Sequence, residues 1–210
     1  MSLAKLLQLA SPALPVGAYS YSGGLEAAVE AGVVRDAATA ERWIGDVLEH
    51  SVAKMEAPML FRFLRSDGLA ELNDEFLATR ETAELRAETV QMGYSLCRLL
   101  KDVGVGEVLL EEPSFPAAYA HAARHWKIAP AEALQAYLWA WIENQVMAAV
   151  KAVPLGQTDG QKLLLRLGER LAPIAEQAAG AQDDELGNFA PGLAMLSSQH
   201  ETQYSRLFRS

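Results

Sequence analysis

Apolar residues along this chain recur three and four positions apart, the spacing that places them on one face of an α-helix. The nearest approach to a β-strand is the short run 108–110. No internal repeat or low-complexity tract interrupts the pattern, which therefore predicts an all-α fold in a single domain. Helices are expected over residues 3–10, 24–31, 37–57, 59–64, 67–77, 80–103, 117–126, 130–153, 158–179 and 189–203.

Proline and capping residues mark the ends of several of these helices. Asp36 suits the N-cap position, where its carboxylate can accept a backbone N–H. Pro58 should break or kink the helix that it interrupts, because it lacks an N–H and its ring crowds the preceding turn. Thr158 and Gln161 have the spacing of a capping box, with Asp159 in the first turn.

The range 130–153 is predicted to be the central helix of a multi-helix bundle. From Leu134 to Val150 it is apolar on nearly every side, which is typical of a helix surrounded by others. Pro130 is suited to its first turn. Three polar residues, Glu143, Asn144 and Gln145, argue against a membrane span.

The composition is that of an ordinary globular protein, since 50% of the 210 residues are hydrophobic and 21% are charged. The net charge of -9, with no basic cluster before the last few residues, argues against a nucleic-acid partner. The single cysteine, Cys97, excludes an intramolecular disulfide, and we expect a buried, unreactive thiol. The N-terminal segment is too short for a signal peptide, so we expect a cytoplasmic protein.

The segment SPALPVGAYSYSGGLE, residues 11–26, separates the first two predicted helices. Its two prolines prevent a helix from running through it, and its three glycines permit positive φ or close backbone approach. Its leucine, valine and tyrosines give the loop something to bury, so we expect it to be packed. A packed aromatic loop on a helical scaffold is a common place for function, although a well-made interhelical turn fits the composition equally well.

Two patterns resemble known catalytic or binding motifs without completing them. Residues 156–162, GQTDGQK, lack the glycine spacing and the Lys-Ser/Thr pair of a phosphate loop, so helix capping is preferred. The exposed helix start could still bind an anionic group of a partner. His121 and His125 share a helix face, but no nearby acid or cysteine completes a metal site, so a solvated face is preferred. No catalytic triad motif is present.

The last residues, QYSRLFR, alternate apolar and cationic side chains. A frayed terminus is one interpretation. We prefer a docking segment, because aromatic and apolar anchors flanked by arginines are typical of interfaces and the rest of the chain is acidic. The expected organisation is a helical domain over 1–203 and a docking tail over 204–210.

Four motifs in order along the chain resemble the urease accessory protein UreF family: LLQLASPALPVGAYSYSGGLE, ETAELRAETVQMGYSLCRLL, AVKAVPLGQTDGQ and HETQYSRLFRS. The resemblance covers essentially the whole length, with a short N-terminus and shortened loops as the main departure. It implies an all-helical, non-catalytic scaffold in urease maturation that has no cofactor of its own and forms a homodimer. The implied partners are the accessory protein UreD/UreH, the GTPase UreG and the urease apoprotein, which receives nickel.

The resemblance also implies roles for individual residues. The tail is similar to the segment that orders against UreD/UreH, and its residues are Tyr204, Arg206, Leu207, Phe208 and Arg209. The loop and the region after the central helix resemble surfaces for the other contacts or for the GTPase, with Tyr19, Ser20, Glu26, Lys151, Gln157 and Asp159 as candidates. The prolines and glycines of these motifs could equally serve only to fix the backbone.

Two alternative functions remain open from the sequence. The protein could be a GTPase-activating protein that inserts Lys151, Arg206 or Arg209 into the site of UreG. It could also be a helical metal-binding enzyme that uses His121 and His125.

Overall fold

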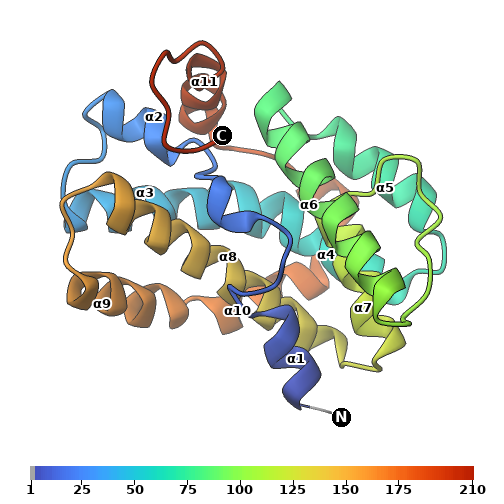
Figure 1. The fold of residues 1–210 in the computed structure, drawn as a ribbon. Coiled ribbons are helices and arrows are strands. Elements are labelled where there is room, and N and C mark those ends of the chain that lie inside the picture. The colour runs from blue at the N-terminus through green and yellow to red at the C-terminus, as the bar shows by residue number, and fades with distance from the viewer. Residues whose placement is uncertain (1–2) are drawn as a thin grey trace.

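The structure is a computed structural model that describes residues 3–210, and within that range it contains helices and no strands (Figure 1). The prediction of an all-α domain is confirmed. The elements in chain order are α1 Leu3–Leu9, the 3-10 helix η1 Ala18–Ser20, α2 Leu25–Glu30, α3 Ala37–Val47, the π-helix η2 Leu48–Glu56, α4 Ala57–Arg65, α5 Leu69–Ala78, α6 Ala83–Asp102, α7 Phe115–His125, α8 Pro130–Ala152, α9 Gln157–Gly168, α10 Leu171–Gly180, the 3-10 helix η3 Asp183–Glu185 and α11 Pro191–His200.

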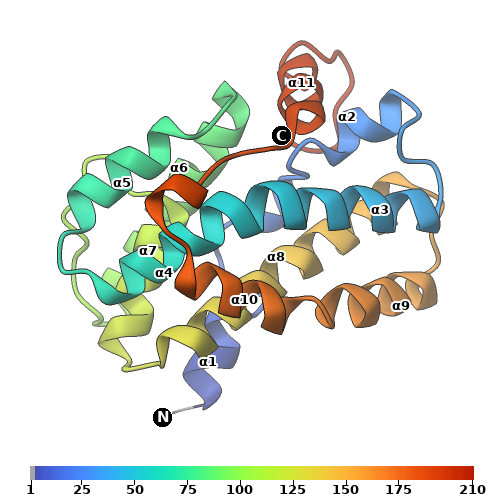
Figure 2. The same cartoon turned by 180° about the vertical axis from the view of Figure 1, so that it is seen from behind.

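Helix α8 runs through the middle of the molecule, as its sequence predicts. It packs against α3, α4, α9 and α10, and α1 and α2 also contact it (Figures 1 and 2). Leu134, Leu138 and Ile142 are fully buried in this core. One stripe of α8 still faces solvent, because Trp139 and Met147 remain partly exposed. Among the described residues no helix is both long enough and apolar enough to cross a membrane.

The elements α3, η2 and α4 form one continuous helical run, so of the break or kink predicted at Pro58 the break is wrong (Figure 2). The run widens to a π-helix just before the proline, where Ala57 N–H donates to Val52 O, five residues back. In a regular helix the ring of Pro58 would crowd the carbonyl of Lys54 and leave it without a donor. Here Lys54 O accepts the N–H of Gly187 at 3.2 Å, and His50 O accepts that of Phe189 at 2.9 Å. The carbonyls of this π-helix thus bind the segment that connects α10 to α11.

The predicted helix over 158–179 is two helices, α9 and α10, separated at Glu169 and Arg170. The capping box expected at Thr158 is not formed, because α9 begins one residue earlier and Gly156 is its N-cap. Thr158 therefore lies inside the first turn. Capping boxes and side-chain caps do form elsewhere: Asp36 caps α3 together with Thr39, and Thr82 caps α6 by accepting the N–H of Leu85 at 3.1 Å.

We expect Thr82→Ala to lower the unfolding free energy by about 1 kcal/mol, the usual cost of removing a helix N-cap. The Thr82 hydroxyl also lies 2.8 Å from Ser197 Oγ on α11, so the substitution removes a second hydrogen bond. Urea denaturation followed by circular dichroism measures the change. Thr158→Ala is the control and should shift the midpoint much less. An equal loss in both variants would mean that Thr158 caps α9 after all.

Candidate functional site: the loop and tail surface

The loop between α1 and α2 is packed, as predicted. Val16, Tyr21 and Ser22 are buried, and successive turns are closed by backbone hydrogen bonds such as Leu14 N–H to Ser11 O at 2.9 Å. Gly24 adopts φ 80°, and a Cβ there would lie 2.9 Å from a methyl group of Leu193 on α11. Glycine is therefore required at this point both by conformation and by space.

The C-terminal tail packs against this loop. Arg209 N–H donates to Ser20 O at 2.8 Å, and Ser22 N–H donates to Ser210 O at 2.9 Å. The Ser22 hydroxyl also donates to Ser210 O, at 2.5 Å. Phe208 and Ser210 are buried by this contact. The tail, the second half of the loop, α2 and α11 consequently lie together at the end of the molecule opposite α1 (Figure 1).

Glu26, at the start of α2, connects the loop to the tail through its carboxylate. It accepts the backbone N–H of Leu207 at 2.7 Å and that of Phe208 at 2.8 Å. Its side chain is only 9% exposed, and its Oε2 also lies 3.3 Å from Nε2 of His200. Hydrogen bonds from N–H groups to a buried carboxylate are among the stronger ones in proteins, so Glu26 fixes the path of the tail.

His200 extends the network from Glu26 to α6. Its Nδ1 lies 2.7 Å from Glu84 Oε2, and the imidazole is fully buried. Glu84 also accepts a hydrogen bond from the guanidinium of Arg206 at 2.7 Å. Four charged or ionisable side chains, from the first turn of α2, the first turn of α6, the last turn of α11 and the tail, are thereby joined.

Two further groups meet the tail from the core side. Lys151, at the end of α8, places its ammonium 5.8 Å from the ring centre of Tyr19 and 5.6 Å from that of Phe208, within the range of cation–π attraction. Glu88 on α6 accepts the hydroxyl of Ser210 at 2.7 Å, and burial raises the pKa of its carboxyl to about 7.

The structure therefore brings Tyr19, Ser20, Glu26 and Lys151 together with the tail, and this set is called the loop–tail surface below. In this surface some of the predicted tail residues are buried and others are exposed. Phe208 is buried against the chain itself, while Tyr204, Leu207 and Tyr19 expose their side chains to solvent. The predicted residues Gln157 and Asp159 lie apart, at the exposed start of α9, where Asp159 pairs with Lys162 at 3.0 Å.

His200, Glu84, Ser22 and Glu88 also belong to this surface, and the sequence pattern does not predict it. His200 is separated by 116 residues from Glu84 and by 174 from Glu26, so no local spacing signals the contact. The only sequence signal for this contact would have been a polar residue on the buried side of each of two helices.

The histidine pair on α7 is not joined by further metal-binding side chains. Among the described residues no group of three or more histidine, cysteine, aspartate or glutamate side chains is arranged to hold a metal ion. His121 is half-buried, and burial lowers the pKa of its imidazole. Cys97 is half-buried in α6, and burial raises the pKa of its thiol to about 11, which disfavours the reactive thiolate.

A cavity of about 280 Å³ lies beneath the loop, between α1, η2, α6 and α8. At its polar end the Tyr137 hydroxyl donates to Glu56 at 2.5 Å, and the guanidinium of Arg80 donates to the other carboxylate oxygen at 3.1 Å. Glu88 lines the same cavity. The polar network of the core thus reaches the underside of the loop–tail surface.

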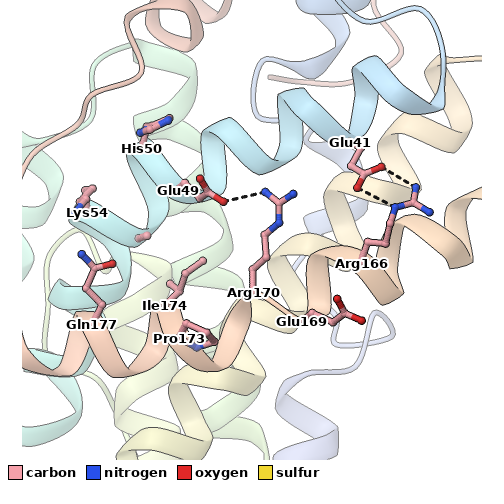
Figure 3. A pocket seen from close by; sticks show the side chains of 11 residues that line it. Glu41, Glu49, His50, Lys54, Arg166, Glu169, Arg170, Pro173, Ile174 and Gln177 are labelled. Atoms are coloured by element: carbon pink, nitrogen blue, oxygen red, sulfur yellow. Dashed lines mark hydrogen bonds and ion pairs between the residues drawn. The ribbon is translucent and has the colours of Figure 1, made fainter.

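A second, more open pocket of about 710 Å³ lies on the other side of η2, against α9 and α10 (Figure 3). Two ion pairs cross it: Arg166 donates twice to Glu41, at 2.9 and 2.7 Å, and Arg170 donates to Glu49 at 2.9 Å. Because its arginines are already paired with carboxylates, this pocket presents a mixed rather than a cationic surface.

These features define a helical protein whose most elaborate surface is built by a loop and a tail that are far apart in sequence. A family model for UreF matches residues 34–168. A urease accessory protein UreF from Azoarcus sp. (strain BH72) is 58% identical, over 100% of this chain and 96% of the relative. Those from Dechloromonas aromatica (strain RCB) and Janthinobacterium sp. (strain Marseille) are 52% and 50% identical, each over 100% of this chain and 98% of the relative. The chain belongs to the UreF family of urease accessory proteins.

Proposed function

We propose that this protein is a non-catalytic scaffold in urease maturation. It acts as a homodimer in the cytoplasm, binds a UreD/UreH accessory protein and the GTPase UreG, and in that assembly supports nickel delivery to the urease apoprotein. The loop–tail surface is the docking site for UreD/UreH. This proposal rests on the family membership and on one observation, the exposure of apolar anchors on a tail whose backbone is fixed.

Tyr204 and Leu207 carry that observation. Tyr204 is fully exposed and Leu207 is 72% exposed. Glu26 holds the backbone N–H of Leu207 at 2.7 Å, and next to Tyr204 the backbone N–H of Gln203 donates to His200 O at 3.0 Å. Large apolar side chains on a fixed backbone lose little conformational entropy on binding, which favours them as interface anchors. Tyr19, 68% exposed, adds an aromatic ring to the same surface.

The alternative, a GTPase-activating protein, receives less support from the geometry. An inserted arginine or lysine must be free to reach the phosphates of a nucleotide on the partner. Arg206 instead donates to Glu84, to Gln203 O and to Glu201 O. Lys151 lies over two aromatic rings of its own chain. These contacts favour a positioning role for Arg206 and Lys151, whereas the third candidate, Arg209, has an exposed side chain.

We expect the double variant Tyr204→Ala, Leu207→Ala to weaken binding to the UreD/UreH partner by roughly tenfold or more, since two anchors are removed. Titration of the labelled partner with the purified full-length chain measures the dissociation constant. The double variant Leu109→Ala, Leu165→Ala is the control, because its side chains are 88% and 71% exposed at other places on the fold. Equal affinity of the two double variants for the partner would refute the proposed docking site.

A further inference from the structure

The three polar residues that interrupt the apolar sequence of α8, Glu143, Asn144 and Gln145, all line the cavity beneath the loop. Asn144 has a structural role, because its amide donates to Tyr21 O at 3.2 Å and so fixes the loop against α8. Glu143 and Gln145 have no hydrogen-bond or ion-pair partner within residues 3–210. Since polar groups removed from solvent are almost always bonded, these two side chains require an explanation.

Gln145 is the more deeply buried of the two. It is only 3% exposed, and its amide carries two N–H donors and one acceptor oxygen. A buried amide without hydrogen bonds is costly. The loop leaves space for this group, since a Cβ at Gly23 would lie 3.1 Å from Nε2 of Gln145, and Gly23 also lines the cavity. A molecule in the cavity, whether water or a ligand, can supply the bonds that the chain does not.

The charged side chains on the wall of the cavity are predominantly acidic. They are Arg80, Lys151, Glu56, Glu81, Glu88 and Glu143. Glu56 and Arg80 neutralise each other at 3.1 Å, which leaves three carboxyl groups and one ammonium. Burial raises the pKa of the Glu143 carboxyl, and no cation of the chain offsets this effect. A positively charged ligand would offset it, whereas water would not.

The shape of the cavity suits a short molecule with an apolar body. Its volume of about 280 Å³ is at the lower end of the range for small-molecule sites. Tyr19 and Met147 line it and are 68% and 36% exposed, so it opens to solvent between the loop and α8 (Figure 1). With about 100° between successive residues of a helix, Glu143 and Gln145 lie on either side of Asn144 and so flank the part of α8 that the cavity covers.

We propose that this cavity binds a small organic cation, specifically a short aliphatic diamine. One ammonium group pairs with the Glu143 carboxylate, the other donates to the amide oxygen of Gln145, and the methylene chain between them lies against the apolar wall. The two positive charges match the excess of acidic groups. This binding site goes beyond the proposed scaffold function and does not depend on the loop–tail surface as a docking site.

The test is a titration of the isotope-labelled, full-length chain with 1,4-diaminobutane at neutral pH, followed by nuclear magnetic resonance. We expect a saturable shift of the side-chain amide signal of Gln145, while that of Gln157, at the exposed start of α9, stays in place. The uncharged 1,4-butanediol has the same length and should bind roughly tenfold more weakly or less, because it makes no charge-assisted hydrogen bond.

Variants assign the binding to the two flanking residues. Glu143→Gln should weaken diamine binding roughly tenfold, since it removes the charge of one acceptor. Gln145→Leu should also weaken binding, yet leave the urea midpoint unchanged or raise it, because an unbonded buried amide is removed. Glu132→Gln, in the exposed first turn of the same helix, is the control and should bind the diamine as wild type does.

Several results would overturn the proposal. They are the lack of a saturable shift at Gln145, equal affinity for the diol, and equal weakening in Glu132→Gln, which would indicate a general attraction to an acidic protein. The same shifts with Mg²⁺ alone would assign the site to a metal ion instead. Because the titration contains no partner protein, this site and the docking site for UreD/UreH can fail independently.

Discussion

Glu56→Leu will lower the unfolding free energy by about 3 kcal/mol, because it leaves a charged guanidinium without its partner in the core. Glu56 accepts a hydrogen bond from Arg80 at 3.1 Å and one from the Tyr137 hydroxyl at 2.5 Å. The side chains of the ion pair are only 11% and 15% exposed, so bulk solvent hydrates the remaining guanidinium poorly. Urea denaturation monitored by circular dichroism measures the change.

Two further variants test this explanation. The double variant Glu56→Leu, Arg80→Met removes both charges and should recover part of the loss, because no unpaired charge remains. Glu41→Leu breaks the ion pair with Arg166, whose side chain is 48% exposed, and should shift the midpoint several times less. If Glu41→Leu and Glu56→Leu were equally destabilised, burial of the Glu56–Arg80 pair would not be the cause.

Gly93→Ala is expected to cost about 3 kcal/mol of unfolding free energy, at the upper end of the usual range for overpacked cores. At Gly93 helix α6 contacts the segment that leads into α7, where an added Cβ would lie 1.9 Å from the carbonyl oxygen of Pro113 and 2.8 Å from the carbonyl carbon of Ser114. Both are backbone atoms, so relief requires the start of α7 to move away from α6. Alanine's higher helix propensity, worth about 1 kcal/mol, does not compensate for this.

The matched control for this prediction is Gly192→Ala in α11. No atom lies within 4 Å of a Cβ built there, and its φ is not positive, so the substitution should leave the urea midpoint unchanged or raise it slightly. A Gly93→Ala midpoint as high as that of Gly192→Ala would show that α6 and α7 can move apart without cost.

The helical pattern could be predicted from the sequence because it depends on neighbours along the chain. The spacing of Leu134, Leu138 and Ile142 marks the buried face of α8 whatever lies against it. Local capping at Asp36 is determined in the same way, by Thr39 three residues later. Both predictions are confirmed.

The errors arose where distant segments decide the local conformation. Pro58 does not break its helix, because Gly187 supplies the hydrogen bond that the Lys54 carbonyl would otherwise lack. Thr158 does not cap α9, because the N-cap lies two residues earlier, at Gly156. Neither outcome has a signal within the few residues that a sequence motif covers.

The sequence by itself determined that this protein is an all-helical member of its family, with α8 as its central helix and with a loop and a tail of unusual composition. Only the tertiary structure decided that the loop and tail meet, that Phe208 turns inward while Tyr204 stays in solvent, and that His200 lies between Glu26 and Glu84. The physical reason is the separation along the chain of the residues that each kind of contact joins. Helix formation depends on contacts three or four residues apart, whereas buried charges are paired by whichever segments the packed core brings together.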